Sequence, residues 1–420
     1  MLPRTIALFG FLVSPSSTIA SRRMTSCAAT TTPTSPPLDL VVIGAGISGL
    51  TCADIAIAQG LHTVVLEARD RIGGRLLSFQ GVDLGASWGW PPHEAEGTKL
   101  ATRFHVDVLP QQLSGRSYQF HNGKMHDVGN VGGRMAPCGP DAVRFQGGYA
   151  VLAEKLAAQL QLHDEEEALD CRNNDEEKGT ATGSLRLGAH VKSVVKSTDG
   201  TDLIHVTFTT NNVDTELITK KVVVAIPPAV LAKAISFSPP LPRQQLAKMQ
   251  QTSTWCGDWC KIVATFRTNW WRPQGVSGVV STQELPVSIW WEGGKGEDEE
   301  VAAITGLGFG LEACQQVGAM LDNKDALKAF VVRYLGLALP GGPQKVSEEL
   351  IDVGGKAWAL DPLTYNGNAT GRDYGHTLLK ERTEWGVFFA GSETEPLNGH
   401  VEGAIVAGRR AAREVIESLS

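Results

Sequence analysis

The chain has 420 residues, of which 42% are hydrophobic and 20% are charged, and its formal net charge is -7. At roughly 150 residues per domain the length allows two or three domains. Its apolar runs, interspersed with 46 glycines and 21 prolines, exclude a wholly disordered, collagen-like or coiled-coil chain. The negative charge gives no general attraction for a polyanion, so nucleic acid is not expected as a partner. We expect a globular protein of the α/β or α+β class.

The first 37 residues differ in composition from the rest. Arg4, Arg22 and Arg23 are the only charged side chains before Asp39. This composition predicts a targeting presequence or disordered leader and favours an organelle, either plastid or mitochondrion, while the apolar run 6–13 keeps a secretory signal open. No run reaches the about 18 to 20 apolar residues that a membrane span needs. We therefore expect a soluble protein without a membrane span.

The seven cysteines give no sign of a disulfide framework, because their number is odd and the chain can bury a core without one. Cys256 and Cys260 have C-x3-C spacing, but no second pair follows at the spacing of metal ligands. The sequence therefore predicts no metal site.

The folded part begins with a strand, a glycine-rich turn and a helix. The apolar run 38–43 leads into G-A-G-I-S-G, a helical stretch follows to about residue 57, and a second strand, 63–66, ends in an acid 18 residues after the last glycine. This is the βαβ pattern of dinucleotide-binding proteins, in which glycines let the backbone approach the pyrophosphate and the acid accepts from a ribose. The candidate cofactor-binding residues here are Gly44, Ala45, Gly46, Ile47, Ser48, Gly49 and Glu67.

The residues that follow indicate which dinucleotide is bound. The run E-A-R-D-R-I-G-G-R at 67–75 resembles the signature of flavin-containing amine oxidases, which bind FAD. The run D-L-G-A-S-W at 83–88 resembles the D-L-G-x-x-W segment that those enzymes place near the flavin. The resemblance adds these candidate cofactor-binding residues: Ala68, Arg69, Gly74, Arg75, Leu84, Gly85, Ala86, Ser87 and Trp88.

Three later segments resemble the same family. Residues 221–228 resemble the V-V-x-A-I-P-P element that returns the chain to the FAD domain, 387–394 resembles F-A-G-T-E-T, and 399–405 resembles G-Y-M-E-G-A-V, which leads into a helix under the flavin. The resemblance implies that the backbone of Val191 reaches the adenine. It also implies cofactor contacts from Gly391, Glu393, His400 and Val401.

Lys261 is the first candidate for chemistry. It lies in the strand-like run 259–266, where alternation places it on the same face as Val263 and Thr265. The run resembles the segment whose lysine, in flavin amine oxidases, holds a water against flavin N5. A buried ammonium there can stabilise developing negative charge and assist the reaction with oxygen.

The chain departs from the monoamine oxidases at two positions that bear on the substrate. Those enzymes have a tyrosine where this chain has His400, and a second tyrosine, next to a cysteine that bonds the flavin, in a segment that aligns with 358–368, where we see Gly367 and Asn368. We therefore expect non-covalent FAD and a substrate cage that is absent or rebuilt by His400 and Asn368. His400 could instead be packed for its shape alone. Trp358 is a candidate flavin-side wall, which makes the candidate catalytic residues Lys261, His400, Asn368 and Trp358.

These patterns predict a Rossmann-like FAD-binding domain and a second, substrate-binding domain of mixed β-sheet and helices. Helices are expected at 151–160, 242–252 and 325–335, and the pairs Trp270-Trp271 and Trp290-Trp291 are expected mainly in the core. The predicted segments are the leader 1–37, the FAD-binding parts 38–90, 186–238 and 356–420, an intervening helical or substrate region 91–185 with an acidic loop 163–178, and the substrate-binding domain 239–355.

The resemblance implies an FAD-dependent amine oxidase. A hydride would pass from the carbon beside the amine nitrogen to flavin N5, the imine would hydrolyse, and dioxygen would be reduced to hydrogen peroxide. Two alternatives stay open, because a fold does not fix a chemistry. One is oxidation of an amino acid or a non-amine substrate, such as a carotenoid-like lipid or a porphyrinogen. The other is a catalytically silent flavoprotein.

Overall fold

Two large β-sheets organise residues 37–420, which form one compact unit. The computed structural model describes residues 36–158, 160–162, 183–294, 302–367, 369–396 and 399–420. Residues 1–35 of the predicted leader and the whole predicted acidic loop 163–178 lie outside the described residues. None of the helices within the described ranges is long and apolar enough to cross a bilayer.

The first sheet contains the predicted dinucleotide-binding unit. Its central strand β1 (Leu38–Ile43) pairs in parallel with β2 (Thr63–Leu66) and with the second half of β13 (Val213–Val224). Both parallel neighbours are rich in β-branched residues, which suit a strand that is buried on two faces. Around this centre the sheet adds β14 (Ser236–Ser238), β11 (His190–Lys196), β12 (Ile204–Thr210), β10 (Gly183–Arg186), β9 (Gln161–Leu162) and β20 (Val387–Phe389).

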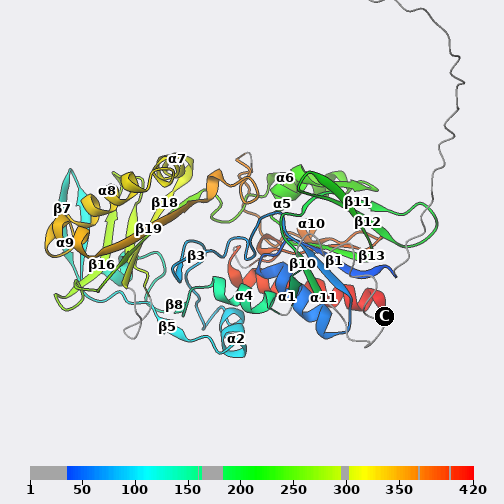
Figure 1. Ribbon diagram of the computed structural model, residues 1–420, viewed down its shortest axis with the longest axis horizontal. Coiled ribbons are helices and arrows are strands. Elements are labelled where there is room, and N and C mark those ends of the chain that lie inside the picture. Colours follow the sequence, from blue (N-terminus) through cyan, green and yellow to red (C-terminus); the bar gives the residue numbers. More distant parts are fainter. Residues whose placement is uncertain (1–35, 159, 163–182, 295–301, 368, 397–398) are drawn as a thin grey trace, which may run out of the picture. The chain divides into compact units, whose positions relative to one another are not determined.

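Helices cover both faces of this sheet. Leu40 and Val42 pack in one core with α1 (Ile47–Ala58), α4 (Ala150–Ala157) and α11 (Val401–Leu419). Val41 and Ile43 face the opposite core, to which α5 (Pro228–Ala234), α6 (Arg243–Gln251) and α10 (Thr377–Lys380) contribute. The helices α1 and α11 run side by side under the sheet (Figure 1). The predicted Rossmann-like fold class is confirmed.

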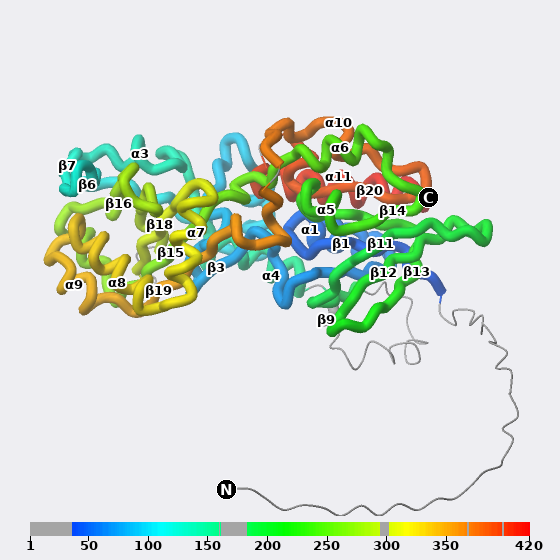
Figure 2. The backbone as a smooth tube through the Cα atoms, turned by 90° about the horizontal axis from the view of Figure 1, so that it is seen from above, coloured from blue at the N-terminus to red at the C-terminus, as the bar shows by residue number. Residues whose placement is uncertain are grey.

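The second sheet is mostly antiparallel and carries Lys261. Its strands in order are β19 (Leu350–Ala357), β15 (Trp259–Phe266), β18 (Ala302–Phe309), β17 (Ile289–Glu292), β16 (Val276–Thr282), β6 (Arg116–His121) and β7 (Lys124–Gly129). One face packs against α7 (Gly310–Leu321), α8 (Lys324–Leu335) and α9 (Gly342–Glu349), as Figures 1 and 2 show. Cys260 and Ile262 point into that helical core, so the alternation of β15 sends Lys261 to the other face.

Shorter elements connect the two sheets along the chain. They are β3 (Ser78–Phe79), β4 (Val82–Asp83), α2 (Glu96–Arg103), β5 (Val108–Pro110), α3 (Gly132–Met135), β8 (Val143–Phe145) and the 3₁₀ turns Trp358–Leu360 and Ser392–Thr394. The interval 91–185 contributes strands to both sheets. The segment boundaries of the sequence analysis remain a prediction, because contacts group residues 37–420 into a single unit.

The local predictions can be compared with these elements directly. The expected helices correspond to α4, α6 and α8, whereas α7 was not predicted. Trp271, Trp290 and Trp291 are fully buried, which confirms their place in the core. Arg410 fixes α11 to the end of β20, because its guanidinium donates to Phe389 O at 3.0 Å and to Glu395 Oε1 at 2.7 Å.

Candidate functional site

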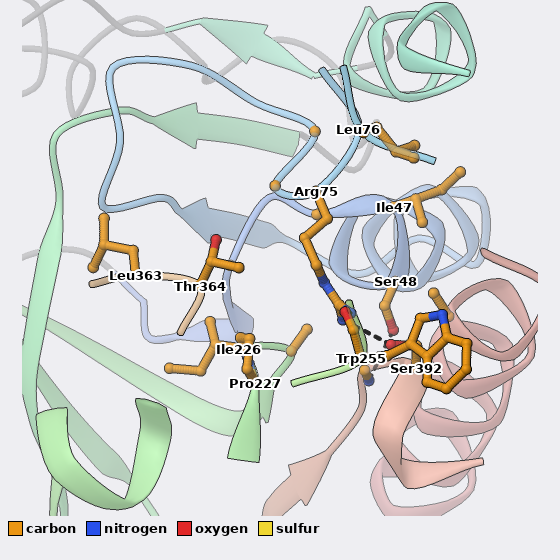
Figure 3. Close-up of a pocket in the computed structure, with 18 of the residues that line it drawn as sticks. Ile47, Ser48, Arg75, Leu76, Ile226, Pro227, Trp255, Leu363, Thr364 and Ser392 are labelled. Atoms are coloured by element: carbon orange, nitrogen blue, oxygen red, sulfur yellow. Dashed lines mark hydrogen bonds between the residues drawn. The ribbon is translucent and has the colours of Figure 1, made fainter. Parts of the chain in front are cut away.

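One cavity of about 450 Å³ gathers most of the residues singled out from the sequence (Figure 3). Among the predicted cofactor-binding residues, its lining includes Gly44, Gly46, Ile47, Ser48, Glu67, Ala68, Arg69, Gly74, Arg75, Gly85, Ala86, Ser87, Trp88, Val191, Gly391, Glu393, His400 and Val401. Lys261 and Trp358 also line it. Ala45, Gly49 and Leu84 do not belong to the lining, and Asn368 lies outside the described residues.

The turn between β1 and α1 forms a cradle at one end of the cavity. A Cβ on Gly46 would meet no atom within 4 Å, so this cavity-lining glycine leaves open space beside the backbone. A Cβ on Gly49 would lie 2.0 Å from Gly44 O, so Gly49 is required for close packing instead. α1 begins at Ile47 without a side-chain cap. Its first-turn N–H groups and dipole therefore suit a pyrophosphate, and the residues present fit a dinucleotide.

Glu67 is buried at the end of β2, beside this cradle. Its carboxylate accepts from Ala45 N at 2.8 Å and from Arg69 N at 2.9 Å, one bond on each oxygen. Each carboxylate oxygen can accept more than one hydrogen bond. Glu67 is therefore fixed in orientation by backbone N–H groups and keeps acceptor capacity toward the cavity.

Arg75 joins the two cofactor motifs that lie far apart in the sequence. Its guanidinium donates to Ser392 Oγ at 2.7 Å, to Glu393 Oε2 at 3.0 Å and to Trp255 O at 3.1 Å, and Figure 3 shows the Arg75 side chain extending toward Ser392 and Trp255. Glu393 is fully buried and also accepts from Trp255 N at 3.1 Å. The charges of Arg75 and Glu393 offset each other, and together they fix the segment that carries Trp255.

A second group of charged contacts lies at the cavity wall beside Glu67. Arg69 donates to Asp361 Oδ1 at 3.0 Å and to Thr364 Oγ1 at 2.9 Å. Burial alone would raise the pKa of Asp361, but Lys356 and Arg69 hold that pKa below its ordinary value. Five further lining residues were not singled out as candidates, although they lie in the segments 221–228, 358–368 and 387–394 that resemble or align with the family: Ile226, Pro227, Leu363, Thr364 and Ser392.

Lys261 lies at the opposite end, where β15 meets the segment 83–88. Its side chain is 6% exposed, and its ammonium donates to Gly85 O at 2.5 Å and to Ser87 Oγ at 2.6 Å. The ammonium also lies 5.6 Å from the centre of the Trp88 ring, within cation–π range. Since an ammonium has three N–H groups, one is left to point into the cavity.

Burial strongly perturbs the titration of this lysine and of a nearby acid. It lowers the pKa of Lys261 to about 8, although the negative charge of Asp83 opposes the shift. It raises the pKa of Asp83 to about 7, although Lys261 and the N–H of Tyr149 favour the ionised form. Such shifts are common where a site tunes the charge of its groups.

An aromatic wall surrounds His400 at the same end. The Trp90 ring stacks on the imidazole with centroids 5.4 Å apart and an interplanar angle of 27°, and the Trp255 ring lies at 5.4 Å and 54°. The Trp259 ring packs against Trp255, with centroids 6.4 Å apart. Trp358 also lines the cavity, and its indole donates to Leu84 O at 3.0 Å. The sequence analysis missed Trp90, Trp255 and Trp259; their closeness to D-L-G-A-S-W and to Lys261 was the available signal.

Comparisons with known proteins agree with this geometry. The family model described as flavin-containing amine oxidoreductase matches residues 121–416, and the model for an NAD(P)-binding Rossmann-like domain matches 42–104. The chain is 26% identical to the flavin-containing amine oxidase B of Sus scrofa over 466 residues, which cover 91% of this chain and 86% of the relative. It is 28% identical to the flavin-containing amine oxidase of Oncorhynchus mykiss over 476 residues, with the same coverage.

Solved structures show the same fold. Cyclohexylamine oxidase from Brevibacterium oxydans IH-35A superposes with a TM-score of 0.66 at 18% identity, covering 91% of this chain and 100% of that one. Wild-type putrescine oxidase bound to putrescine gives a TM-score of 0.65 at 19% identity, covering 91% and 99%. At these identities the likeness concerns the fold alone.

Proposed function

Because the chain belongs to the family of flavin-containing amine oxidoreductases, we propose that it binds FAD without a covalent bond and oxidises the C–N bond of a small monoamine, with dioxygen as the acceptor. The main support is the meeting of three features in one cavity: the dinucleotide cradle, the buried Lys261 and the aromatic wall around His400. A fold by itself would not select a reaction.

The proposed position of FAD follows from the chemistry of the lining. Gly46 and the start of α1 would hold the pyrophosphate, Glu67 the adenosine ribose, and the backbone of Val191 the adenine. The start of α11, at His400 and Val401, would place a positive dipole end at the flavin's pyrimidine side.

Non-covalent binding is supported by the raised pKa of the cysteine in the described cavity lining. Cys256 is a cysteine of the cavity lining, and burial raises its pKa to about 12. The thiolate is the nucleophilic form of cysteine, so this side chain is poorly suited to bond a flavin. The segment 358–368 contains no cysteine.

The chain's own residues position the reactants and control charge. Bound FAD would supply the hydride acceptor. The tryptophans exclude water from the carbon that is oxidised, which strengthens electrostatic interactions there. Lys261 keeps one N–H for a water molecule, and its positive charge stabilises negative charge that develops when oxygen is reduced. At neutral pH the ammonium form of Lys261 prevails, because its pKa of about 8 lies above 7.

The charges of the lining favour a monoamine over a polyamine. Among the described lining residues, the carboxylates are Glu67 and Glu393, and both are held by N–H groups of the cofactor motifs. The guanidinium groups of Arg69 and Arg75 are paired with Asp361 and Glu393. A second ammonium on the substrate would thus meet no unpaired carboxylate in the described lining. A substrate carboxylate could meet the ammonium of Lys261, two of whose three N–H groups already donate to Gly85 O and Ser87 Oγ. We place the substrate nearer to cyclohexylamine than to putrescine, the amines named for two of the similar structures.

The proposal is tested by cofactor and product analysis of the purified protein. Acid precipitation should release FAD into the supernatant. The holoenzyme is then incubated with cyclohexylamine, benzylamine, putrescine, spermidine, leucine and phenylalanine, and peroxide and carbonyl products are measured. We expect both products from a monoamine. Peroxide from amino acids alone would replace the proposal with amino-acid oxidation, and no product from any compound would contradict it.

A further inference from the structure

His400 has a carboxylate partner that no sequence motif indicates. Glu94 Oε1 lies 2.5 Å from His400 Nδ1, although the two residues are 306 positions apart. Both side chains are largely buried, with 15% of Glu94 and 26% of His400 exposed. Such a bond is well shielded from solvent and therefore stronger than a surface contact.

The backbone around Glu94 is built to hold this contact. The N–H of Glu94 donates to Trp90 O at 2.7 Å, so a tight turn carries both the carboxylate and the tryptophan that stacks on His400. Two residues later, the N–H of Glu96 donates to Glu402 Oε2 at 2.7 Å, in the first turn of α11. The turn is thus fixed to the same helix start that carries His400, and Glu94 has little freedom to move away.

The contact with Glu94 sets the tautomer of His400, that is, which ring nitrogen carries the hydrogen and which keeps a lone pair. An ionised carboxylate can only accept hydrogen bonds, so Nδ1 carries the hydrogen that Glu94 receives. In a neutral imidazole this leaves Nε2 as an acceptor. No group among the described residues bonds Nε2, and His400 lines the cavity. A carboxylate that accepts from one ring nitrogen of a histidine also makes the other nitrogen, here Nε2, a better hydrogen-bond acceptor.

We propose that Glu94 is a positioning residue for the substrate: it holds His400 with Nε2 as a hydrogen-bond acceptor, and Nε2 binds an N–H group of the amine between the rings of Trp90 and Trp255. The inference rests on the proposed function, because it assigns the binding of the amine nitrogen within the same cavity. With Nε2 as the acceptor, the amine nitrogen can be bound beside His400 without a free carboxylate in the described lining. The negative charge of Glu94 reaches the amine through the imidazole, and the rings supply the apolar walls.

The first test is a double-mutant cycle on the FAD-loaded enzyme, with the best amine of the panel as substrate. In Glu94→Gln the side chain can donate to Nδ1 as well as accept from it, so hydrogen on Nδ1 is no longer imposed; where the amide donates, the ring hydrogen lies on Nε2 and the acceptor is lost. His400→Phe keeps a ring between the tryptophans but removes both nitrogens. We expect each variant to raise KM by about ten- to a hundredfold with a much smaller fall in kcat, since the lost bond mainly binds substrate. In the His400→Phe background, Glu94→Gln should have no further effect.

Glu96→Gln is the matched control, because this carboxylate lies on the same segment but pairs with Arg409 and Lys99 rather than His400. It should leave KM unchanged. An unchanged KM in Glu94→Gln, or losses that multiply in the double variant, would overturn the inference, since Glu94 would then act independently of His400. Absence of amine turnover in the unmodified enzyme would be a failure of the proposed function instead.

A second test needs no turnover. In holoenzyme labelled with ¹⁵N-histidine, the His400 signals can be assigned by their loss in His400→Phe, and ¹⁵N shifts distinguish the two neutral tautomers and the charged ring. We expect the tautomer with hydrogen on Nδ1, and its loss in Glu94→Gln. A hydrogen on Nε2 in the unmodified enzyme would leave no acceptor and would refute the inference.

Discussion

Lys261 Nζ donates to Ser87 Oγ at 2.6 Å, which links β15 to the D-L-G-A-S-W segment across the cavity. A second bond from the same nitrogen, to Gly85 O at 2.5 Å, fixes the ammonium still further. A lysine in a strand is usually exposed, but this one contacts a segment from another part of the chain and is 6% exposed. Its position indicates a role for its charge rather than for solubility.

Replacing Lys261 with Met should slow the reaction of the reduced enzyme with oxygen. Met keeps the length and fills the buried space, while loss of one well-placed charged group costs on the order of 10²- to 10³-fold in rate. The measurement is the rate of flavin reoxidation by stopped flow after anaerobic reduction. Lys192→Met is the control, because Lys192 lies at the surface with Asp214 and should not change that rate. A Lys261→Met enzyme that reoxidises at the normal rate would remove the assigned role.

The reoxidation rate should also fall as pH rises through about 8, where buried Lys261 loses its proton. The sign follows from the shift. Burial lowers the pKa from the ordinary value of 10.5, so the ammonium is lost earlier than in water, and its stabilising charge is lost with it. This fall in the reoxidation rate at high pH should be absent in Lys261→Met. A rate that is constant from pH 7 to 10 would contradict this assignment.

Gly399→Ala should disturb the aromatic wall. Gly399 has φ +72, and a Cβ there would lie 2.2 Å from Trp255 Cβ, so the new methyl group displaces the tryptophan. We expect a loss of about 1 to 3 kcal/mol in the free energy of unfolding from backbone strain, together with a raised KM for the amine.

Gly200→Ala is the matched control for that change. Gly200 also has positive φ, +86, but a Cβ there would meet nothing within 4 Å. It should cost about 1 kcal/mol of stability through strain alone and leave KM unchanged. Denaturant unfolding and steady-state kinetics of both variants separate the two effects. An equal KM in both would show that Trp255 does not contact the substrate.

Glu393→Gln should destabilise the protein and weaken FAD binding. The change removes a fully buried partner of Arg75, and breaking one side of a buried ion pair typically costs about 3 to 5 kcal/mol. The measurements are urea unfolding of the FAD-free protein and titration of that protein with FAD. As a control, Asp214→Asn breaks the exposed pair with Lys192 and should leave the free energy of unfolding nearly unchanged. Similar losses in both variants would show that burial of Glu393 is energetically unimportant.

The sequence predicted the cavity lining around the glycine-rich turn better than the lining around His400, for a physical reason. A dinucleotide is held mainly by backbone and glycines, so the residues 44–49 and 67–75 form a continuous pattern that can be read locally. The contact of Glu94 with His400 joins residues 306 positions apart and depends on how α2 and α11 pack. No spacing rule indicates such a pair.

The elements of the fold also differ in how far the sequence predicts them. Elements with a clear local signal, such as the apolar run of β1, the helix α1 after the glycine-rich turn, and α8, agree with prediction, because local pattern and tertiary packing favour the same structure. The elements between residues 88 and 145 are short, from three to eight residues, so each gives too short a pattern for a firm prediction. Trp90 belongs to this interval, which is why its place against His400 was not predicted.

The central claim is that this cavity holds FAD and that a monoamine transfers a hydride to the bound FAD. The anaerobic absorption spectrum of the holoenzyme tests this claim most directly. Oxidised flavin absorbs near ~450 nm and loses this band when a substrate reduces it. We predict rapid bleaching by cyclohexylamine or benzylamine, and little or none by putrescine, spermidine, leucine or phenylalanine. A flavin band that no amine bleaches, or protein that takes up no FAD, would contradict the account.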